Sequence, residues 1–114
     1  MTKLKFELGN KEDEKAFEYV YNGFIIGGAL TQTKGIVALR REIGLLDKLH
    51  AISKDCECGK KIVNDEVSRE LIGGEVELEK PELDMLINYI SIVPWSTGRS
   101  GRDAVKIIDW LSSL

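Results

Sequence analysis

The feature that most constrains the fold of this chain is the helical pattern of residues 33–53, TKGIVALRREIGLLDKLHAIS. One face of such a helix carries Ile36, Leu39, Ile43 and Leu46, together with His50. Leu45 and Leu49 fall on the adjoining arc, which widens the apolar surface to roughly half of the helix circumference. A helix of this kind must be covered from two sides, so we predict that helix 33–53 lies at the centre of the core. Thr31 or Thr33 is its expected N-cap.

Two segments alternate apolar and charged residues, as half-buried strands do. Residues 3–8 read KLKFEL, and residues 75–79 read EVELE. The first segment contributes lysines and the second contributes glutamates, so we predict that they pair as antiparallel strands. The pair Gly73-Gly74 predicts a hairpin turn that joins strand 75–79 to a further strand at residues 69–72.

Residues 11–22 form a second predicted helix. Asn10 is a good N-cap, and acidic residues follow it in the first turn, where the helix dipole favours negative charge. Gly23 is expected to end this helix in the left-handed conformation, with residues 24–30 as a buried connector. The alternative is a β-hairpin over residues 16–26 in which the same glycine closes the turn.

Two further helices, residues 81–93 and 102–113, are predicted to form a helical hairpin. Pro81 suits the first turn of its helix, and Pro94 ends that helix because proline disfavours helical backbone in the residue before it. Ser100 is expected to be the N-cap of the last helix.

These elements predict a single α+β domain over residues 1–114, with about four helices packed on a small antiparallel sheet. The net charge of −3 argues against a dedicated nucleic-acid binder. No apolar run approaches the ~20 residues that span a bilayer, and the first residues lack the apolar segment of a signal peptide. We therefore predict a cytoplasmic protein with reduced cysteines and no membrane partner.

The sequence contains one cluster that resembles a metal site, formed by His50, Cys56 and Cys58. A structural zinc ion takes four ligands, so Asp55 or Glu57 would have to complete the site. The spacing of the cysteines also differs from the CxxC of redox proteins. We expect free thiols, no cofactor and, in the absence of a catalytic constellation, no enzymatic activity; metal binding remains the alternative.

Residues 97–103, TGRSGRD, resemble an anion-binding turn. They place Arg99 and Arg102 at a helix N-terminus, where free backbone N–H groups bind anionic groups. A glycine-containing turn with a serine cap between two helices has the same appearance without any such function. Glu42 falls within the apolar arc of helix 33–53, so its carboxylate either lies at the edge of that arc or meets a cation from another segment, for which the same arginines are candidates.

Two other groups are candidate partner contacts. Lys34, Arg41 and Lys48 follow one another at seven-residue spacing on the polar side of helix 33–53, which would suit nucleic acid but is also typical of a solvated face. Trp95 and Trp110 are aromatic residues at which binding energy would concentrate if they were exposed.

Residues 74–114 combine an acidic strand, a helix that ends in VPW, an STG turn and a closing helix that ends in DWL. This stretch resembles the C-terminal part of small uncharacterised proteins from bacteriophage gene sets. The resemblance implies no catalytic residue; it implies an accessory protein that modulates a larger host or viral complex in the host cytoplasm. We therefore predict a non-enzymatic protein–protein interaction module whose partner is another protein or a second copy of itself. The alternatives are a nucleic-acid-associated regulator and a small metal-binding protein.

Overall fold

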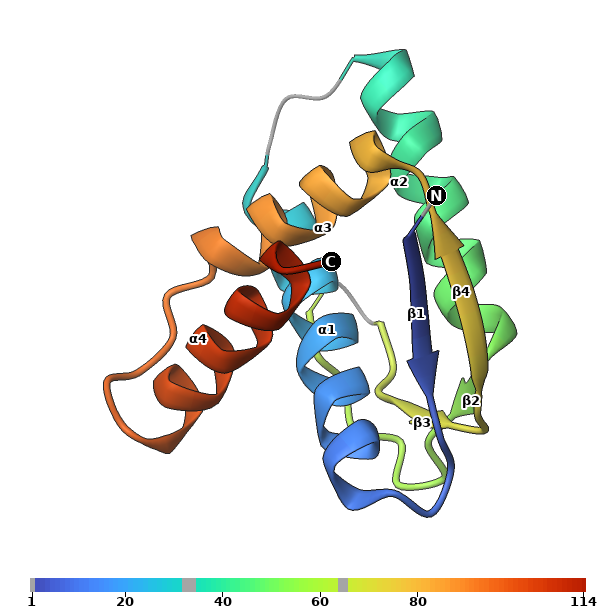
Figure 1. Cartoon of the computed structure of the whole chain (residues 1–114), viewed down its shortest axis with the longest axis vertical. Coiled ribbons are helices and arrows are strands. Elements are labelled where there is room, and N and C mark those ends of the chain that lie inside the picture. The colour runs from blue at the N-terminus through green and yellow to red at the C-terminus, as the bar shows by residue number, and fades with distance from the viewer. Residues whose placement is uncertain (1, 32–34, 64–65) are drawn as a thin grey trace.

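The structure is a computed structural model that describes residues 2–31, 35–63 and 66–114, and it confirms the predicted α+β class (Figure 1). The helices are α1 (Lys11–Leu30), α2 (Ile36–Ala51), α3 (Lys80–Ile92) and α4 (Arg99–Ser112). The strands are β1 (Thr2–Phe6), β2 (Ser53–Asp55), β3 (Arg69–Leu71) and β4 (Gly74–Leu78). None of the described helices combines the length and the apolar content that crossing a membrane requires.

The antiparallel pair predicted from alternating charges is confirmed as β1 and β4. Lys3 lies opposite Glu77, and its Nζ is 3.4 Å from Oε1 of Glu75 and 3.7 Å from Oε1 of Glu77. On the other face of the pair, Leu4 lies opposite Val76, and both are buried. The ladder therefore has one charged face in solvent and one apolar face in the core.

The predicted hairpin between strands 69–72 and 75–79 is wrong. β3 pairs with β2, a strand that we did not predict, so the described residues form two separate two-stranded sheets. Gly73 and Gly74 have φ values of +101° and +146°, and the N–H groups of Ile72 and Gly73 both donate to the carbonyl of Ile52, at 2.8 Å and 3.3 Å. A Cβ at Gly74 would lie 2.8 Å from Cγ2 of Ile52. The two glycines thus carry the chain closely past the end of α2 instead of folding it back on β3.

The predicted end of the first helix at Gly23 is also wrong. α1 begins as predicted, with Oδ1 of Asn10 accepting N–H groups of its first turn, but it continues to Leu30. It therefore includes the whole of residues 16–26, for which a hairpin was the alternative. Its buried residues are Phe17, Val20, Tyr21, Gly23, Phe24, Gly27 and Gly28. Figure 1 shows α1 between the α3–α4 pair and the strands, so α1 is the helix around which the core forms.

The glycines of α1 are needed for its contact with α3. A Cβ at Gly27 would overlap the carbonyl group of Tyr89, and a Cβ at Gly23 would lie 3.0 Å from Cγ1 of Ile90. A glycine costs a helix about 1 kcal/mol relative to alanine. Here the close approach of α3 offsets that cost, because it buries apolar side chains of both helices.

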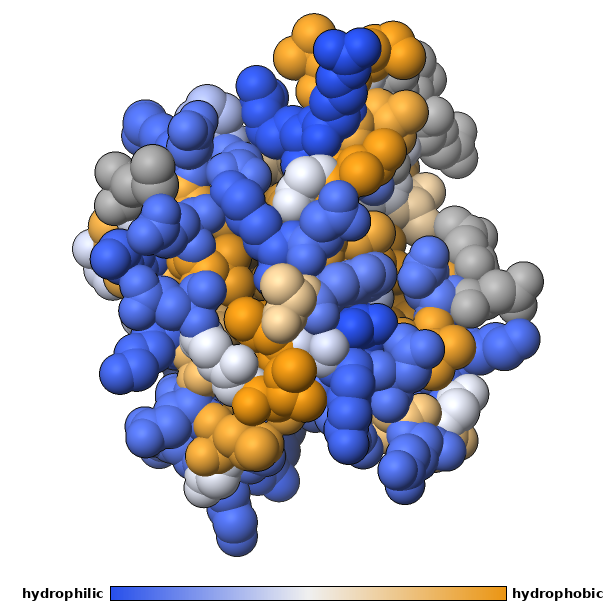
Figure 2. Space-filling model, turned by 90° about the vertical axis from the view of Figure 1, so that its right-hand side faces the viewer, coloured by the Kyte–Doolittle hydropathy of each residue, from blue (hydrophilic) through white to orange (hydrophobic). Residues whose placement is uncertain are grey.

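The prediction that helix 33–53 forms the centre of the core is wrong. Only Leu45 and Leu49 of α2 are buried, whereas Ile36, Leu39 and Ile43 are 64%, 40% and 50% exposed. Figure 2 shows hydrophobic side chains exposed at the upper end of the molecule, where α2 begins, in addition to others in the lower half of this face. α1 occupies the central position, and α2, whose two buried residues Leu45 and Leu49 lie in its C-terminal half, contacts α3, β2 and β4.

The predicted N-caps of this helix are wrong as well. The N-cap of α2 is Gly35, which makes no side-chain capping hydrogen bond. Thr31 instead ends α1, where its Oγ1 donates to the carbonyl of Gly27 at 3.0 Å. Thr33 lies outside the described residues.

The C-terminal helical hairpin is confirmed, with a different start for its second helix. Val93 is extended, with ψ of 132°, before Pro94, as predicted for the end of α3. α4 begins at Arg99 with Gly98 as its N-cap, so Ser100 lies inside the first turn and does not cap it. A Cβ at Gly101 would overlap the carbonyl of the connector, so the absence of a side chain there lets the helix start early.

Candidate functional site

An apolar groove of about 880 Å³ lies between the end of α3, the connector that follows it and α4. Its apolar wall consists of Ile90, Val93, Pro94, Trp95, Val105 and Ile108. Arg102 and Lys106 stand at its edge, and none of the described residues that line it is acidic. Neither of these two cations forms an ion pair with a described residue. Lys106 also lines a neighbouring pocket together with Asp103. The groove therefore combines an apolar floor with two cations that form no ion pair among the described residues.

Trp95 is held rigidly in the wall of this groove. Its Nε1 donates to the carbonyl of Ile90 at 2.9 Å, near the end of α3, and this carbonyl also accepts the N–H of Val93 at 3.4 Å. Its ring packs against the ring of Tyr19, with 5.5 Å between the centroids, and the hydroxyl of Tyr19 donates to Asp103 at 3.1 Å. The side chain is half-buried, so one part is fixed and another part is open to a ligand.

The other C-terminal residues predicted to bind a partner are only partly assembled with Trp95. Arg102 lines the groove, whereas Arg99 is exposed next to it and does not line it. Trp110 packs edge-on against Phe6, at 5.9 Å between centroids, and lines a different pocket. Val105 also lines the groove. We did not select it from the sequence, because its position there does not indicate that α3 lies opposite.

Asp103 follows Arg102 in the sequence but does not neutralise the positive charge at the groove. Its Oδ2 lies 2.8 Å from Nζ of Lys15, on the side of α4 that faces α1. The hydrogen bond from Lys15 lowers the pKa of Asp103, and the hydroxyl of Tyr19 acts in the same direction. This carboxylate is therefore satisfied within the molecule and away from the groove.

The basic set predicted for nucleic-acid binding is not continuous. Nζ of Lys48 lies 2.7 Å from Oε1 of Glu82 and 2.8 Å from the carbonyl of Glu77, so its charge joins α2 to the start of α3. Burial raises the pKa of Glu82. The hydrogen bonds from Lys48 and from the backbone N–H of Glu79 outweigh burial and hold this pKa below its usual value. Arg41 is half-buried beside α3, and Lys34 lies outside the described residues.

The two polar residues within the apolar arc of α2 bind tyrosines of other helices. Oε2 of Glu42 accepts from the hydroxyl of Tyr89 at 3.1 Å, and neither of the candidate partners, Arg99 and Arg102, forms an ion pair with it in the described structure. Burial and the charge of Glu42 raise the pKa of Tyr89 to about 12. Nε2 of His50 lies 3.2 Å from the hydroxyl of Tyr21.

The structure does not bring together the three residues of the alternative metal site. His50 faces Tyr21 on α1, whereas Cys56 and Cys58 lie on the turn after β2. Among residues 2–31, 35–63 and 66–114, no group of three histidine, cysteine or acidic side chains is placed to hold a metal ion. The cysteines are therefore to be considered as a pair of thiols.

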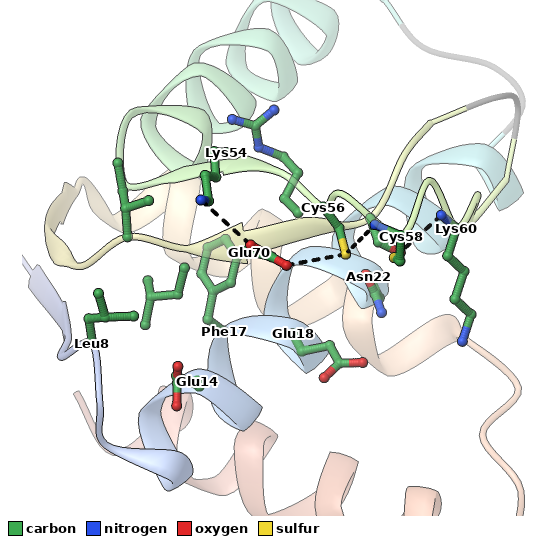
Figure 3. A pocket seen from close by; sticks show the side chains of 14 residues that line it. Leu8, Glu14, Phe17, Glu18, Asn22, Lys54, Cys56, Cys58, Lys60 and Glu70 are labelled. Atoms are coloured by element: carbon green, nitrogen blue, oxygen red, sulfur yellow. Dashed lines mark hydrogen bonds and ion pairs between the residues drawn. The ribbon is translucent and has the colours of Figure 1, made fainter.

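These thiols line a pocket of about 560 Å³ between their turn, β3 and α1 (Figure 3). Sγ of Cys56 accepts the N–H of Cys58 at 3.4 Å, and Sγ of Cys58 accepts the N–H of Lys60 at 3.5 Å. Sγ of Cys56 also lies 3.4 Å from Oε1 of Glu70. The hydrogen bond between the two cysteine side chains raises the pKa of Cys56 to about 11 and lowers that of Cys58. The adjacent thiols thus differ in the ease with which they lose a proton.

A scan against protein-family models found no match, and searches of curated proteins and of solved structures found no similar protein. The resemblance of residues 74–114 to bacteriophage proteins therefore stays a prediction.

Proposed function

We propose that this protein is a non-enzymatic interaction module whose α3–α4 groove binds an apolar segment of an acidic partner protein. The observation that carries this proposal is the apolar groove with Arg102 and Lys106 at its edge and no described acidic residue in its lining. Burial of apolar surface contributes about 25 cal/mol per Å², and charge complementarity selects and orients the partner.

The apolar lining with two cations beside it favours a short amphipathic segment as the occupant of the groove. A helix laid in a groove inserts apolar residues at helical spacing and keeps its polar face in solvent. In such a segment, apolar residues would contact Trp95 and Val105, and flanking aspartate or glutamate residues would meet Arg102 and Lys106. The rigid, half-buried ring of Trp95 has the properties of a binding hot spot.

An accessory role in a larger complex is consistent with this proposal. A small module that binds an acidic segment of a host or viral protein would modulate that protein by binding alone. This extends the resemblance of residues 74–114 to bacteriophage proteins, and it makes the partner an acidic protein and not a nucleic acid.

Selection from a random peptide library tests the proposal directly. We expect the selected peptides to be acidic with apolar anchors, and to shift the NMR signals of Trp95 and of the first turns of α4. Val105→Glu should weaken their binding at least tenfold. Val37→Glu is the matched control, because Val37 is also an exposed valine on a helix, 71% against 60% for Val105, and lies outside the groove. Basic or uncharged peptides, or signals that shift elsewhere, would contradict the proposal.

A second surface supports self-association through α2. Ile36, Leu39 and Ile43 are exposed and follow the spacing of three and four residues that forms the contact line of paired helices. Arg40 and Asp47 are exposed along this line. The midpoint between these two residues lies between positions 43 and 44, close to Ile43. If two copies of α2 pair antiparallel about a two-fold axis at this point, Arg40 of each copy faces Asp47 of the other. This self-complementary charge favours a second copy over an unrelated protein.

Charge reversal separates this pairing from non-specific aggregation. In sedimentation velocity experiments, Arg40→Asp and Asp47→Arg should each weaken the dimer at least tenfold, and the double variant should restore it. Leu39→Asp should abolish it. A wild-type protein that stays monomeric at millimolar concentration, or a double variant as weak as the single variants, would contradict the pairing.

A further inference from the structure

The turn that carries the two cysteines is built in a way that favours thiolate chemistry. The N–H of Gly59 donates to the carbonyl of Cys56 at 3.1 Å, and Gly59 has a φ of +66°, which closes the turn. Within this turn each sulfur accepts one backbone N–H, from Cys58 and from Lys60 respectively. Hydrogen bonds donated to sulfur stabilise the thiolate relative to the thiol.

The surroundings of the two sulfurs differ in a way that assigns them different roles. Cys58 is exposed, so its sulfur is accessible to a reagent. Cys56 is half-buried, and the carboxylate of Glu70 lies 3.4 Å from its sulfur, which favours the protonated thiol. Nζ of Lys54 lies 3.9 Å from the other oxygen of Glu70 and partly balances its charge. In Figure 3 both cysteines lie at the same end of the pocket, with Glu70 beside Cys56.

We propose that Cys56 and Cys58 form a thiol–disulfide exchange centre that reduces a disulfide of a small molecule or peptide. Cys58 is the attacking sulfur and Cys56 is the resolving sulfur. This activity is independent of the groove, because no described residue lines both the groove and the cysteine pocket.

The exchange is balanced without a metal or an external oxidant. The thiolate of Cys58 attacks one sulfur of the substrate disulfide, that S–S bond breaks, and the released thiolate takes a proton from water. Cys56 then passes its proton to Glu70 and attacks Sγ of Cys58. The bond between Cys58 and the substrate sulfur breaks, and that sulfur leaves as a thiol with the proton from Glu70. The substrate disulfide is reduced to two thiols, and the protein is oxidised to a Cys56–Cys58 disulfide.

The pocket provides space for the part of the substrate that flanks the disulfide. Its volume of about 560 Å³ lies within the range of small-molecule sites. Apolar side chains of Leu8, Phe17 and Leu71 line it together with Lys54 and Glu18. A lining that mixes apolar groups with both charges suits a peptide, so glutathione disulfide and a disulfide-bonded peptide are the natural probes.

The first test compares the reactivity of the two thiols in the reduced protein. Alkylation by iodoacetamide at pH 7, followed by peptide mass spectrometry, should show Cys58 reacting at least tenfold faster than Cys56. The same protein unfolded in urea is the reference, and there the two rates should converge. Equal rates in the folded protein would overturn the proposal.

The second test uses oxidised glutathione as substrate. The wild type should form the Cys56–Cys58 disulfide and release two glutathione molecules, whereas Cys56→Ser should stop at a stable mixed disulfide on Cys58. Cys58→Ser should react at least tenfold more slowly than Cys56→Ser. Stable mixed disulfides on both cysteines of the wild type, or equal rates for the two serine variants, would overturn the proposal.

Glu70→Gln separates the role of the carboxylate from a structural role. It should leave the rate of mixed-disulfide formation unchanged and slow the formation of the intramolecular disulfide at least fivefold, so that the mixed disulfide accumulates. Glu18→Gln is the matched control, because Glu18 lines the same pocket without a hydrogen bond to either cysteine in the described structure. Equal effects of the two substitutions would remove Glu70 from the mechanism and overturn its assignment.

Discussion

α1 and α2 are adjacent helices whose sequences give the opposite impression of their positions in the fold. α1 contains Gly23, Gly27 and Gly28, which favour a break in the helix. Among the described helices, α1 nevertheless has the most buried residues. α2 has a wide apolar surface, yet its N-terminal half is exposed. The comparison shows that a helix is buried only where another element can pack closely against it. A high apolar content in the helix itself is not sufficient.

The largest expected difference between the helices concerns their glycines. Gly27→Ala places a methyl group against the carbonyl of Tyr89 and should destabilise the protein by about 3 kcal/mol. Gly44→Ala in α2 meets open space and should stabilise the monomer by up to about 1 kcal/mol. Urea unfolding of both variants at low protein concentration measures this difference. Similar unfolding free energies for the two variants would show that α3 does not pack on α1 as described.

The next difference lies within α2 and compares its two halves. Leu49 is fully buried, so Leu49→Ala should cost about 3 kcal/mol from lost burial and the cavity that remains. Leu39 is 40% exposed, so Leu39→Ala should change the stability of the monomer by less than about 0.5 kcal/mol. Thermal unfolding of the two variants distinguishes the buried half from the open half. A large loss for Leu39→Ala would mean that this half is covered within the monomer.

The smallest expected effect is a pH dependence from the contact between α2 and α1. Burial, followed by the charge of Arg69, holds the pKa of His50 below its usual value of 6.5. As the pH falls below 6.5, the unfolded chain binds a proton that the folded protein binds only at lower pH, so stability decreases. His50→Gln should remove this part of the decrease between pH 7 and pH 5.5, measured as the change in Tm. An identical pH dependence in the variant would exclude His50 as its source.

The sequence predicted those parts of the fold that local chemistry determines. The charges of β1 and β4 predicted their pairing, Asn10 predicted the start of α1, and Pro94 predicted the end of α3. The continuation of α1 through Gly23 could not be predicted, because it depends on a close contact with a helix that follows more than 50 residues later.

The candidate site was predictable to a similar extent. Trp95 and Arg102 were selected from the sequence and do meet in the groove, whereas Val105 completes it only because α4 packs against the end of α3. His50 was grouped with the cysteines by proximity in sequence, but α2 directs it to Tyr21. Glu70, which contacts Cys56, comes from a strand whose pairing with β2 was not anticipated.

Amide hydrogen exchange tests most directly whether α1 forms the core while the start of α2 is open. We predict that amides of residues 20–28 in α1 exchange only through global unfolding, with a free energy equal to that from urea unfolding. Amides of residues 40–43 in α2 should exchange through local opening at a free energy several kcal/mol lower, measured at a concentration where the protein is monomeric. Equal protection of the two segments, or stronger protection in α2, would contradict this account of the fold.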